Sequence, residues 1–250
     1  MRPGRAGILR APFDAGTSVS TPLAVFDLDN TLLAGDSDHL WGEFLIAEKL
    51  VDPQHYRAGN DRFYADYRAG ELDIDAFAAF SFEPMVRLGR ERLEPLRERF
   101  VEQQILPRIA PSAPALLERH RAAGEQLLIT TATNRFVTEP IAELLGVESL
   151  IATDPEEIDG RFTGRIAGTP NFRDGKITRL KQWMLEQGIT DARLTVYSDS
   201  LNDLPLLQFA DQAIAVDPDE VLRREAAERG WPVISLREAP PEPKLETETP

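Results

Sequence analysis

The stretch Leu23–Thr31, LAVFDLDNT, joins a short apolar run to two aspartates that lie two residues apart. The run Leu23–Phe26 follows Thr21-Pro22 and predicts a strand that is buried on both faces. Asp27 and Asp29 come next, and two buried carboxylates are costly unless a cation neutralises them. Mg²⁺ binds oxygen ligands and keeps coordination positions for water and phosphate. An acidic turn after a strand is the alternative interpretation, because an Asp-x-Asp pair often occurs by chance.

The composition excludes several classes of function. The chain has 250 residues, of which 42% are hydrophobic, and this suits one large domain or a core with an insert. A formal charge of −14 and a pI of about 4.7 disfavour binding to nucleic acid or to an anionic membrane. The absence of cysteine excludes disulfides, thiolate catalysis and cysteine metal sites. No apolar run is long enough for a membrane span, and the cytoplasm is the expected compartment.

The two ends of the chain predict no packed structure. Residues 1–20 combine arginine with glycine, proline and serine, and they lack the apolar run of a secretory signal. We therefore expect a disordered leader. Residues 238–250 are rich in proline and glutamate, and we expect a disordered tail there.

Apolar residues follow a helical spacing soon after Thr31. Ser37 or Asp38 would cap the first helix, and Pro84 would kink or divide a later one. The pattern predicts a helical bundle over residues 38–106, inserted after the first strand. The aromatic residues of this segment are expected in the core of the bundle, and His39 on its surface or elsewhere in the insert. The expected helices lie near 40–50, 53–69, 73–88 and 90–106.

From Ala113 onward, predicted strands alternate with predicted helices. This alternation predicts right-handed crossovers and a doubly wound, Rossmann-like parallel sheet. We therefore expect an α/β core made of residues 21–37 and 107–237, with the bundle 38–106 as a helical cap. A hairpin around Asp159-Gly160 is also expected. The predicted core strands lie at 23–26, 126–130, 150–153, 194–197, 213–216 and 232–235.

Polar residues gather where these strands end, which is where ligands bind in such sheets. Lys176 lies in the first turn of a predicted helix, where the helix dipole disfavours a cation. We expect it to have a buried anionic partner, with a solvated surface lysine as the alternative. The polar residues that follow the strands are Asp27, Asp29, Thr31, Thr130, Thr131, Thr133, Ser198, Asp199, Ser200, Asn202 and Asp203.

These elements, in this order, resemble the haloacid dehalogenase-type (HAD) phosphohydrolase superfamily. The chain carries D-x-D-x-T at 27–31, an apolar strand ending at Thr131, then Lys176, then the pair Asp199 and Asp203. The resemblance extends from about residue 23 to residue 235. The helical insert and the stretches GDSDHLWGEFL and LITTATN resemble the branch of phosphoserine-phosphatase-like and histidinol-phosphatase-like enzymes. Ser198 departs from the pattern, because many relatives carry glycine there.

The resemblance implies a Mg²⁺-dependent phosphatase in which Asp27 attacks phosphorus and becomes an aspartyl-phosphate. Asp29 would protonate the leaving alkoxide and later accept a proton from water. Asp27, Asp199 and the backbone carbonyl of Asp29 would hold the metal, and Asp203 would support that site. Relatives that cleave C–halogen bonds lack the second aspartate, so Asp29 favours phosphate chemistry.

The resemblance also implies the binding residues for a small-molecule phosphomonoester. Thr131, Asn202 and Lys176 would contact the phosphoryl group, with Thr130 or Thr133 as alternatives to Thr131.

The leaving group of the substrate is predicted from Asp36. This residue lies nine positions after Asp27, where the branch carries an acidic residue that faces the amine of the substrate. We expect an amino-alcohol phosphate, with histidinol phosphate first and phosphoserine next. The carboxylate of phosphoserine would require a cationic partner, such as Arg62 or Arg68. The alternative is that Asp36 is a turn residue and Asp38 a helix cap.

Two other functions fit parts of the pattern. A phosphotransferase would pass the phosphoryl group to a small alcohol through the same intermediate. A receiver-like phospho-aspartate binding module also uses acidic residues, threonine, lysine and Mg²⁺, but it is shorter and has no helical cap. Neither a nucleic-acid nor a membrane partner is expected, and the sequence does not define an oligomeric state.

Overall fold

The computed structural model describes residues 20–238. The predicted leader and tail lie outside the described residues, except for one residue of each. None of the helices in the described part of the chain is both long and apolar enough to cross a membrane.

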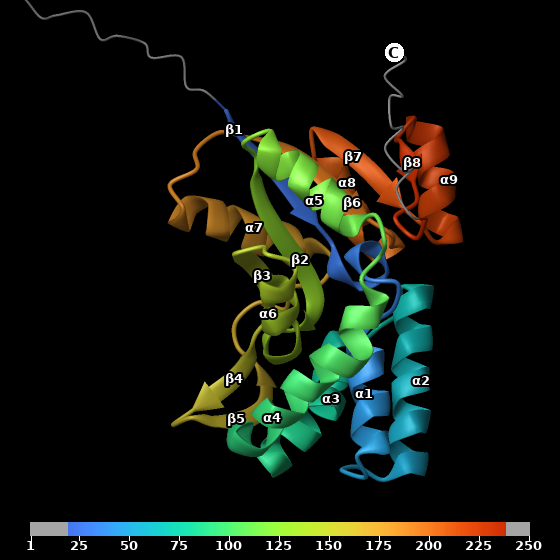
Figure 1. The fold of residues 1–250 in the computed structure, drawn as a ribbon, viewed down its shortest axis with the longest axis vertical. Helices are drawn as coiled ribbons and strands as arrows, with labels where there is room; N and C mark the ends of the chain where they lie inside the picture. The colour runs from blue at the N-terminus through green and yellow to red at the C-terminus, as the bar shows by residue number, and fades with distance from the viewer. Residues whose placement is uncertain (1–19, 239–250) are drawn as a thin grey trace, which may run out of the picture.

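A six-stranded, fully parallel sheet forms the centre of the molecule (Figure 1). The predicted Rossmann-like α/β class is therefore confirmed. Its short apolar strands are those of a sheet that is buried on both faces. In spatial order the strands are β3 (Ser149–Thr153), β2 (Gln126–Asn134), β1 (Thr21–Phe26), β6 (Ala192–Ser198), β7 (Gln212–Val216) and β8 (Val233–Ile234).

Helices cover both faces of this sheet. Leu23 and Val25 of β1 pack in one apolar cluster with α7, α8 and α9, while Ala24 and Phe26 pack in another with α5 and α6. Because successive strand residues point to opposite faces, this alternation makes β1 the centre of both cores. The core helices are α5 (Ala113–Ala122), α6 (Arg135–Leu144), α7 (Asp174–Glu186), α8 (Leu204–Phe209) and α9 (Glu220–Arg229).

The predicted helical insert follows β1 and lies beyond the carboxyl end of that strand (Figure 1). Its two connections to the core lie side by side, because Leu33 and Ile109 form an antiparallel bridge. The last helix widens into a π-helical turn at Val101–Ile105 and a 3₁₀ turn at Leu106–Arg108. The four helices are α1 (Ser37–Ala47), α2 (Pro53–Ala69), α3 (Ile74–Leu88) and α4 (Arg90–Phe100).

One local prediction about the insert is wrong, and one of the two alternatives for another is excluded. The side chain that caps α1 is Asp36, whose Oδ1 accepts the His39 amide at 2.8 Å, and not Ser37 or Asp38. The three neighbouring residues all carry capping oxygens, so only the backbone path distinguishes them. Pro84 also does not divide α3, which continues through it to Leu88. A proline removes one helical hydrogen bond, and the buried packing of this helix compensates for that loss.

The predicted hairpin is present as β4 (Pro155–Ile158) and β5 (Arg161–Ile166), which pair antiparallel. Asp159 and Gly160 both have positive φ, as a type I′ turn requires. β2 is longer than predicted, and its pairing with β3 shifts register between Thr131 and Asn134. The longer strand includes Thr131 and Thr133, which a strand that ends at Thr130 would not.

Candidate active site

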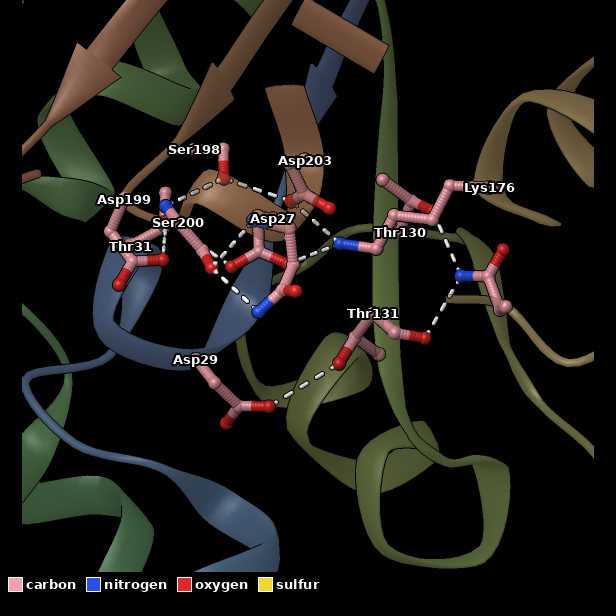
Figure 2. Close-up of polar contacts among 12 residues, drawn as sticks. Asp27, Asp29, Thr31, Thr130, Thr131, Lys176, Ser198, Asp199, Ser200 and Asp203 are labelled. Atoms are coloured by element: carbon pink, nitrogen blue, oxygen red, sulfur yellow. Dashed lines mark hydrogen bonds and ion pairs between the residues drawn. The ribbon is translucent and has the colours of Figure 1, made fainter. Parts of the chain in front are cut away.

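Asp27 lies at the carboxyl end of β1, where the chain turns sharply. Asn30 adopts a positive φ of 59°, which asparagine tolerates better than most residues, and its amide donates to the Gly35 carbonyl. The turn brings the Thr31 hydroxyl back to within 3.3 Å of both Asp27 Oδ2 and Asp199 Oδ1. The ends of β1 and β6 therefore meet at this hydroxyl, as Figure 2 shows.

Lys176 has the buried anionic partners that its position predicts. Its Nζ donates to Asp27 Oδ1 and to Asp203 Oδ2, at 2.7 Å in each case, and the side chain is 1% exposed. Gly175 allows the preceding loop to pack closely, because a Cβ there would lie 2.1 Å from the Pro170 carbonyl oxygen. The alternative of a solvated surface lysine is therefore wrong.

The charged groups of this cluster shift one another's pKa values. Burial alone would lower the pKa of Lys176, but the carboxylates of Asp203 and Asp27 outweigh it and raise that pKa. Burial raises the pKa of Asp27 to about 7, with further increases from Asp203 and Asp29, although Lys176 opposes the shift. Burial, followed by Asp27 and Asp203, raises the pKa of Asp199 well above its ordinary value. The cluster thus contains more buried negative charge than one lysine neutralises.

Ser198 positions Asp203, a contact that sequence reasoning missed. The Ser198 hydroxyl donates to Asp203 Oδ2 at 2.8 Å and accepts the Ser200 amide at 3.2 Å. A glycine at position 198 could make neither contact. The departure from the family pattern therefore adds a hydrogen bond to the carboxylate that holds Lys176.

The Asp29 side chain points away from Lys176 and toward the end of β2 (Figure 2). Its Oδ1 accepts the Ser37 amide at 2.6 Å, and its Oδ2 accepts the Thr133 hydroxyl at 2.8 Å. The Thr131 hydroxyl lies 3.3 Å from the same oxygen. Thr130 is different, because its hydroxyl accepts the buried Asn171 amide at 2.9 Å. Of these three threonines of β2, Thr131 and Thr133 border the site.

The residues present fit the predicted magnesium ion. Asp27 is buried and Asp199 is half-buried, both contact the same hydroxyl and both have a raised pKa, so a divalent cation would relieve their repulsion. Among residues 20–238 no group of three or more His, Cys, Asp or Glu side chains is arranged to hold a metal. The predicted set is compatible with that finding, because its third ligand is the backbone carbonyl of Asp29.

A pocket opens from this cluster into the insert. Asp27, Asp29 and the end of β2 form its floor, and helices α1, α2 and α3 form its walls. No lysine or arginine is among the described residues that line it. Some of the aromatic side chains predicted in the core of the insert line the pocket instead. Those that line the pocket are Phe63, Tyr64, Tyr67 and Phe77.

Two further carboxylates, Asp36 and Asp38, line the same pocket. Burial, followed by repulsion from Asp29, raises the pKa of Asp36 to about 7. Burial, followed by Asp36 and Asp29, raises the pKa of Asp38 well above its ordinary value. His39, expected on the surface or elsewhere in the insert, also lines the pocket, and its Nδ1 has no hydrogen-bond partner within residues 20–238.

Asn202 connects the core to the insert. Its amide nitrogen donates to the Tyr67 carbonyl at 2.8 Å, and its oxygen accepts from Arg173 Nε at 3.3 Å. Arg173 also donates to the carbonyl of Gly70, at the end of α2. Asn202 is not among the residues that line the pocket, so its predicted contact with phosphate stays a prediction.

The two arginines predicted for a substrate carboxylate lie outside the pocket. The Arg62 guanidinium stacks 4.2 Å from the centre of the Phe63 ring, and Arg68 lines a separate cleft beside Asp199. The positions of Asp36 and of the arginines could not be derived from spacing alone. They depend on how α1 and α2 pack over the sheet.

A buried carboxylate beside a lysine at the end of a parallel strand is suited to nucleophilic attack on a phosphate-type anion. The model of the family of haloacid dehalogenase-like hydrolases (HAD) matches residues 24–208. The chain belongs to this family, as its sequence predicts, and the receiver alternative is therefore wrong.

Two relatives align along most of the chain. A histidinol-phosphatase of Neisseria meningitidis is 44% identical over 219 residues, which cover 86% of this chain and 99% of that protein. A phosphoserine phosphatase of Mycobacterium tuberculosis is 33% identical over 223 residues, which cover 87% and 71%.

Solved structures share the fold. A protein of unknown function from Bordetella pertussis gives a TM-score of 0.81 at 42% identity and covers 87% of this chain and 100% of its own. A phospho-aspartyl intermediate analogue of phosphoserine phosphatase gives 0.62 at 19% identity, with 88% and 95% covered. At that identity the likeness extends to the fold alone.

Proposed function

We propose that this enzyme is a Mg²⁺-dependent phosphatase that acts on a small amino-alcohol phosphate, preferably histidinol phosphate, through an aspartyl-phosphate on Asp27. The enzyme class predicted from the sequence, a phosphoric monoester hydrolase, is confirmed by the family and by its phosphatase relatives. The substrate, the metal, the intermediate and a cytoplasmic location are parts of the proposal.

One observation carries the proposal. A single pocket has Asp27, the ion-pair partner of Lys176, at one end and the carboxylates of Asp36 and Asp38 at the other, and no lysine or arginine is among the described residues that line it. The first end suits a phosphoryl group, and the second suits a cation attached to it. A phosphorylated amino alcohol has both features in one small molecule.

In the first step, an oxygen of Asp27 attacks phosphorus and the bond from phosphorus to the alcohol oxygen breaks. Asp29 gives its proton to that leaving oxygen, and its two hydroxyl neighbours, Thr131 and Thr133, hold the carboxyl group in place. Lys176, already 2.7 Å from Asp27, offsets charge on the transferred phosphoryl group. Bound Mg²⁺ would reduce the repulsion between the carboxylate of Asp27 and the phosphate.

In the second step, water attacks phosphorus and Asp29 accepts its proton. The bond between phosphorus and the Asp27 oxygen breaks, which releases inorganic phosphate and restores the carboxylate. Asp29 thus begins the next cycle protonated, so the proton balance closes. Asp29 lines the same pocket as Asp27, which suits both transfers.

The helical insert, taken as a cap over residues 38–106, would exclude bulk water during the first step. Contacts between Arg173 and Gly70 and between Asn202 and Tyr67 hold the end of α2 against the core. Tyr67 and Tyr64 border the pocket on that side. Because the cap covers the site, small phosphates should be hydrolysed and folded phosphoproteins should not.

The electrostatics of the pocket favour histidinol phosphate over phosphoserine. Both carry an amine, which Asp36 or Asp38 would bind. Phosphoserine also carries a carboxylate, and a pocket lined by four aspartates with no lysine or arginine would repel it. Histidinol phosphate has no carboxylate and therefore no unpaired charge in such a pocket.

The proposal is tested by steady-state kinetics on purified enzyme with Mg²⁺. We expect kcat/KM for histidinol phosphate to exceed that for phosphoserine and for neutral sugar phosphates. Release of inorganic phosphate is measured with and without a small alcohol, so that transfer to the alcohol is detected in the same assay. A preference for phosphoserine or for sugar phosphates would contradict the substrate, and a lack of phosphate release would contradict the reaction.

A further inference from the structure

Beside Asp38 the pocket adjoins a narrow recess between α3 of the insert and the strands β2, β3 and β5. Asp38, Ile74, Phe77 and Ala132 line both spaces, so the recess is a deeper part of the pocket. Its inner wall includes Ser81, which is 6% exposed and whose Oγ has no hydrogen-bond partner within residues 20–238. A buried hydroxyl without a partner is unusual, and a ligand group that reaches it would satisfy it.

Asp36 and Asp38 differ in the hydrogen bonds that their side chains make with the described residues. Asp36 caps α1 through Oδ1, whereas the Asp38 side chain has no hydrogen-bond or ion-pair partner in residues 20–238. Mg²⁺ and Lys176 would be occupied by the phosphoryl group and the catalytic carboxylates. Apart from His39, the described residues that line the pocket offer these carboxylates no basic side chain, so the leaving group supplies the counter-charge, and one amine can approach only one of them closely.

We infer that, in addition to the amine already proposed at Asp36, the pocket selects a ring nitrogen donor that lies between Asp38 and Ser81. This inference rests on the proposed function and names the part of the substrate that gives specificity. An imidazole that carries a proton on both nitrogens presents two N–H groups on opposite sides of one small ring. One donates to the Asp38 carboxylate and the other to Ser81 Oγ.

The apolar walls suit the face of such a ring. Phe63, Tyr64 and Phe77 line the pocket, and Phe77 also extends along the recess. A flat cation gains from aromatic faces as well as from a carboxylate at its edge. An aliphatic amine alone would leave this aromatic wall and the Ser81 hydroxyl without contacts.

Three phosphate esters distinguish the amine contact from the ring contact. Histidinol phosphate has the amine and the ring, 2-aminopropyl phosphate has only the amine, and 3-(imidazol-4-yl)propyl phosphate has only the ring. For the unmodified enzyme, kcat/KM for histidinol phosphate should exceed that for 2-aminopropyl phosphate by about 10- to 100-fold, the range for one hydrogen bond to a charged group.

Asp38→Asn should bring that ratio close to one, and Ser81→Ala should lower it several-fold in the same direction. Asp36→Asn should instead weaken both amine-bearing substrates and spare the ring-only one. Asp75→Asn, an exposed aspartate in the first turn of α3, is the matched control and should leave all three values unchanged. The inhibition constant of histidinol, the product alcohol, should follow the same order.

The outcomes separate this inference from the proposed function. Equal kcat/KM for histidinol phosphate and 2-aminopropyl phosphate would overturn the ring site and leave the amino-alcohol phosphatase standing. An unchanged ratio in Ser81→Ala and in folded Asp38→Asn would overturn it as well. Hydrolysis of other phosphomonoesters without any of these three would overturn the proposed substrate, and this inference with it.

Discussion

The two ends of the pocket differ in how their negative charge is balanced. At the reacting end, Lys176 lies 2.7 Å from both Asp27 and Asp203, so the chain supplies part of the counter-charge itself (Figure 2). At the other end, Asp36 and Asp38 face the pocket with no lining lysine or arginine. The reacting end is thus prepared before the substrate arrives. In the proposed function, the leaving-group end becomes balanced when a cation occupies it, and this dependence would give selectivity.

The largest effect should follow from a change to the nucleophile at the reacting end. Asp27→Asn should lower kcat by on the order of 10⁴- to 10⁶-fold, because an amide cannot form the aspartyl-phosphate. Removal of metal with EDTA should also abolish turnover of the unmodified enzyme, and added Mg²⁺ should restore it. Circular dichroism would verify that the variant is folded. Substantial activity in folded Asp27→Asn would exclude the proposed mechanism.

Asp29 connects the two ends, and its loss should depend on the leaving group. Asp29→Asn should slow hydrolysis of alkyl phosphates by on the order of 10²- to 10⁴-fold, because their alkoxide needs a proton. Aryl phosphates with acidic leaving groups should lose much less, since they depart without protonation. The measurement is kcat across a series of leaving groups. Equal losses on both kinds would assign Asp29 to the metal site alone.

The stability of the reacting end should depend on its lysine. Lys176→Met should lower the free energy of unfolding by about 3–5 kcal/mol, because Asp27 and Asp203 would remain buried without their partner. Urea denaturation of the metal-free protein measures this change. Combining Lys176→Met with Asp203→Asn should recover part of the loss. Lys181→Met, an exposed change in the same helix, is the control.

Much of this fold follows from local patterns. The apolar runs that become β1, β2 and β6 are short and continuous, which is typical of buried parallel strands. The rule that ligands bind at the carboxyl ends of strands then brings Asp27, Thr131 and Asp199 to one place without any knowledge of the structure. Lys176 was recognisable because a cation in the first turn of a helix is disfavoured unless a partner is near.

The parts that sequence reasoning missed depend on contacts between distant segments. Asn202 meets the Tyr67 carbonyl only because α2 packs against the core, and no spacing in the chain encodes that contact. Aromatic residues at helical spacing look alike whether they fill a core or line a pocket, so Phe77 could not be assigned in advance. The unpartnered hydroxyl of Ser81 depends on what surrounds it and has no signature in the sequence.

The smallest predicted effect concerns Asp36, at the other end of the pocket, where a substitution should raise the free energy of unfolding instead of lowering it. Burial and Asp29 raise the pKa of Asp36 to about 7 in the folded protein, from an ordinary value of 3.8. The folded state therefore binds this proton more tightly than the unfolded chain does. The corresponding stability is fully present below the ordinary pKa and is lost as pH rises through about 7.

Asp36→Asn removes this titration and keeps a side chain that can cap α1. In metal-free protein the variant should therefore gain stability relative to the unmodified enzyme as pH rises from about 4 to about 8, by on the order of 1 kcal/mol. Urea denaturation near both pH values measures the difference. Asp52→Asn is the matched control, because Asp52 caps α2 through the same kind of contact, to His55 N at 2.7 Å, but is exposed. If Asp36→Asn and Asp52→Asn respond alike to pH, Asp36 is not an unbalanced charge, and the contrast between the two ends of the pocket does not hold.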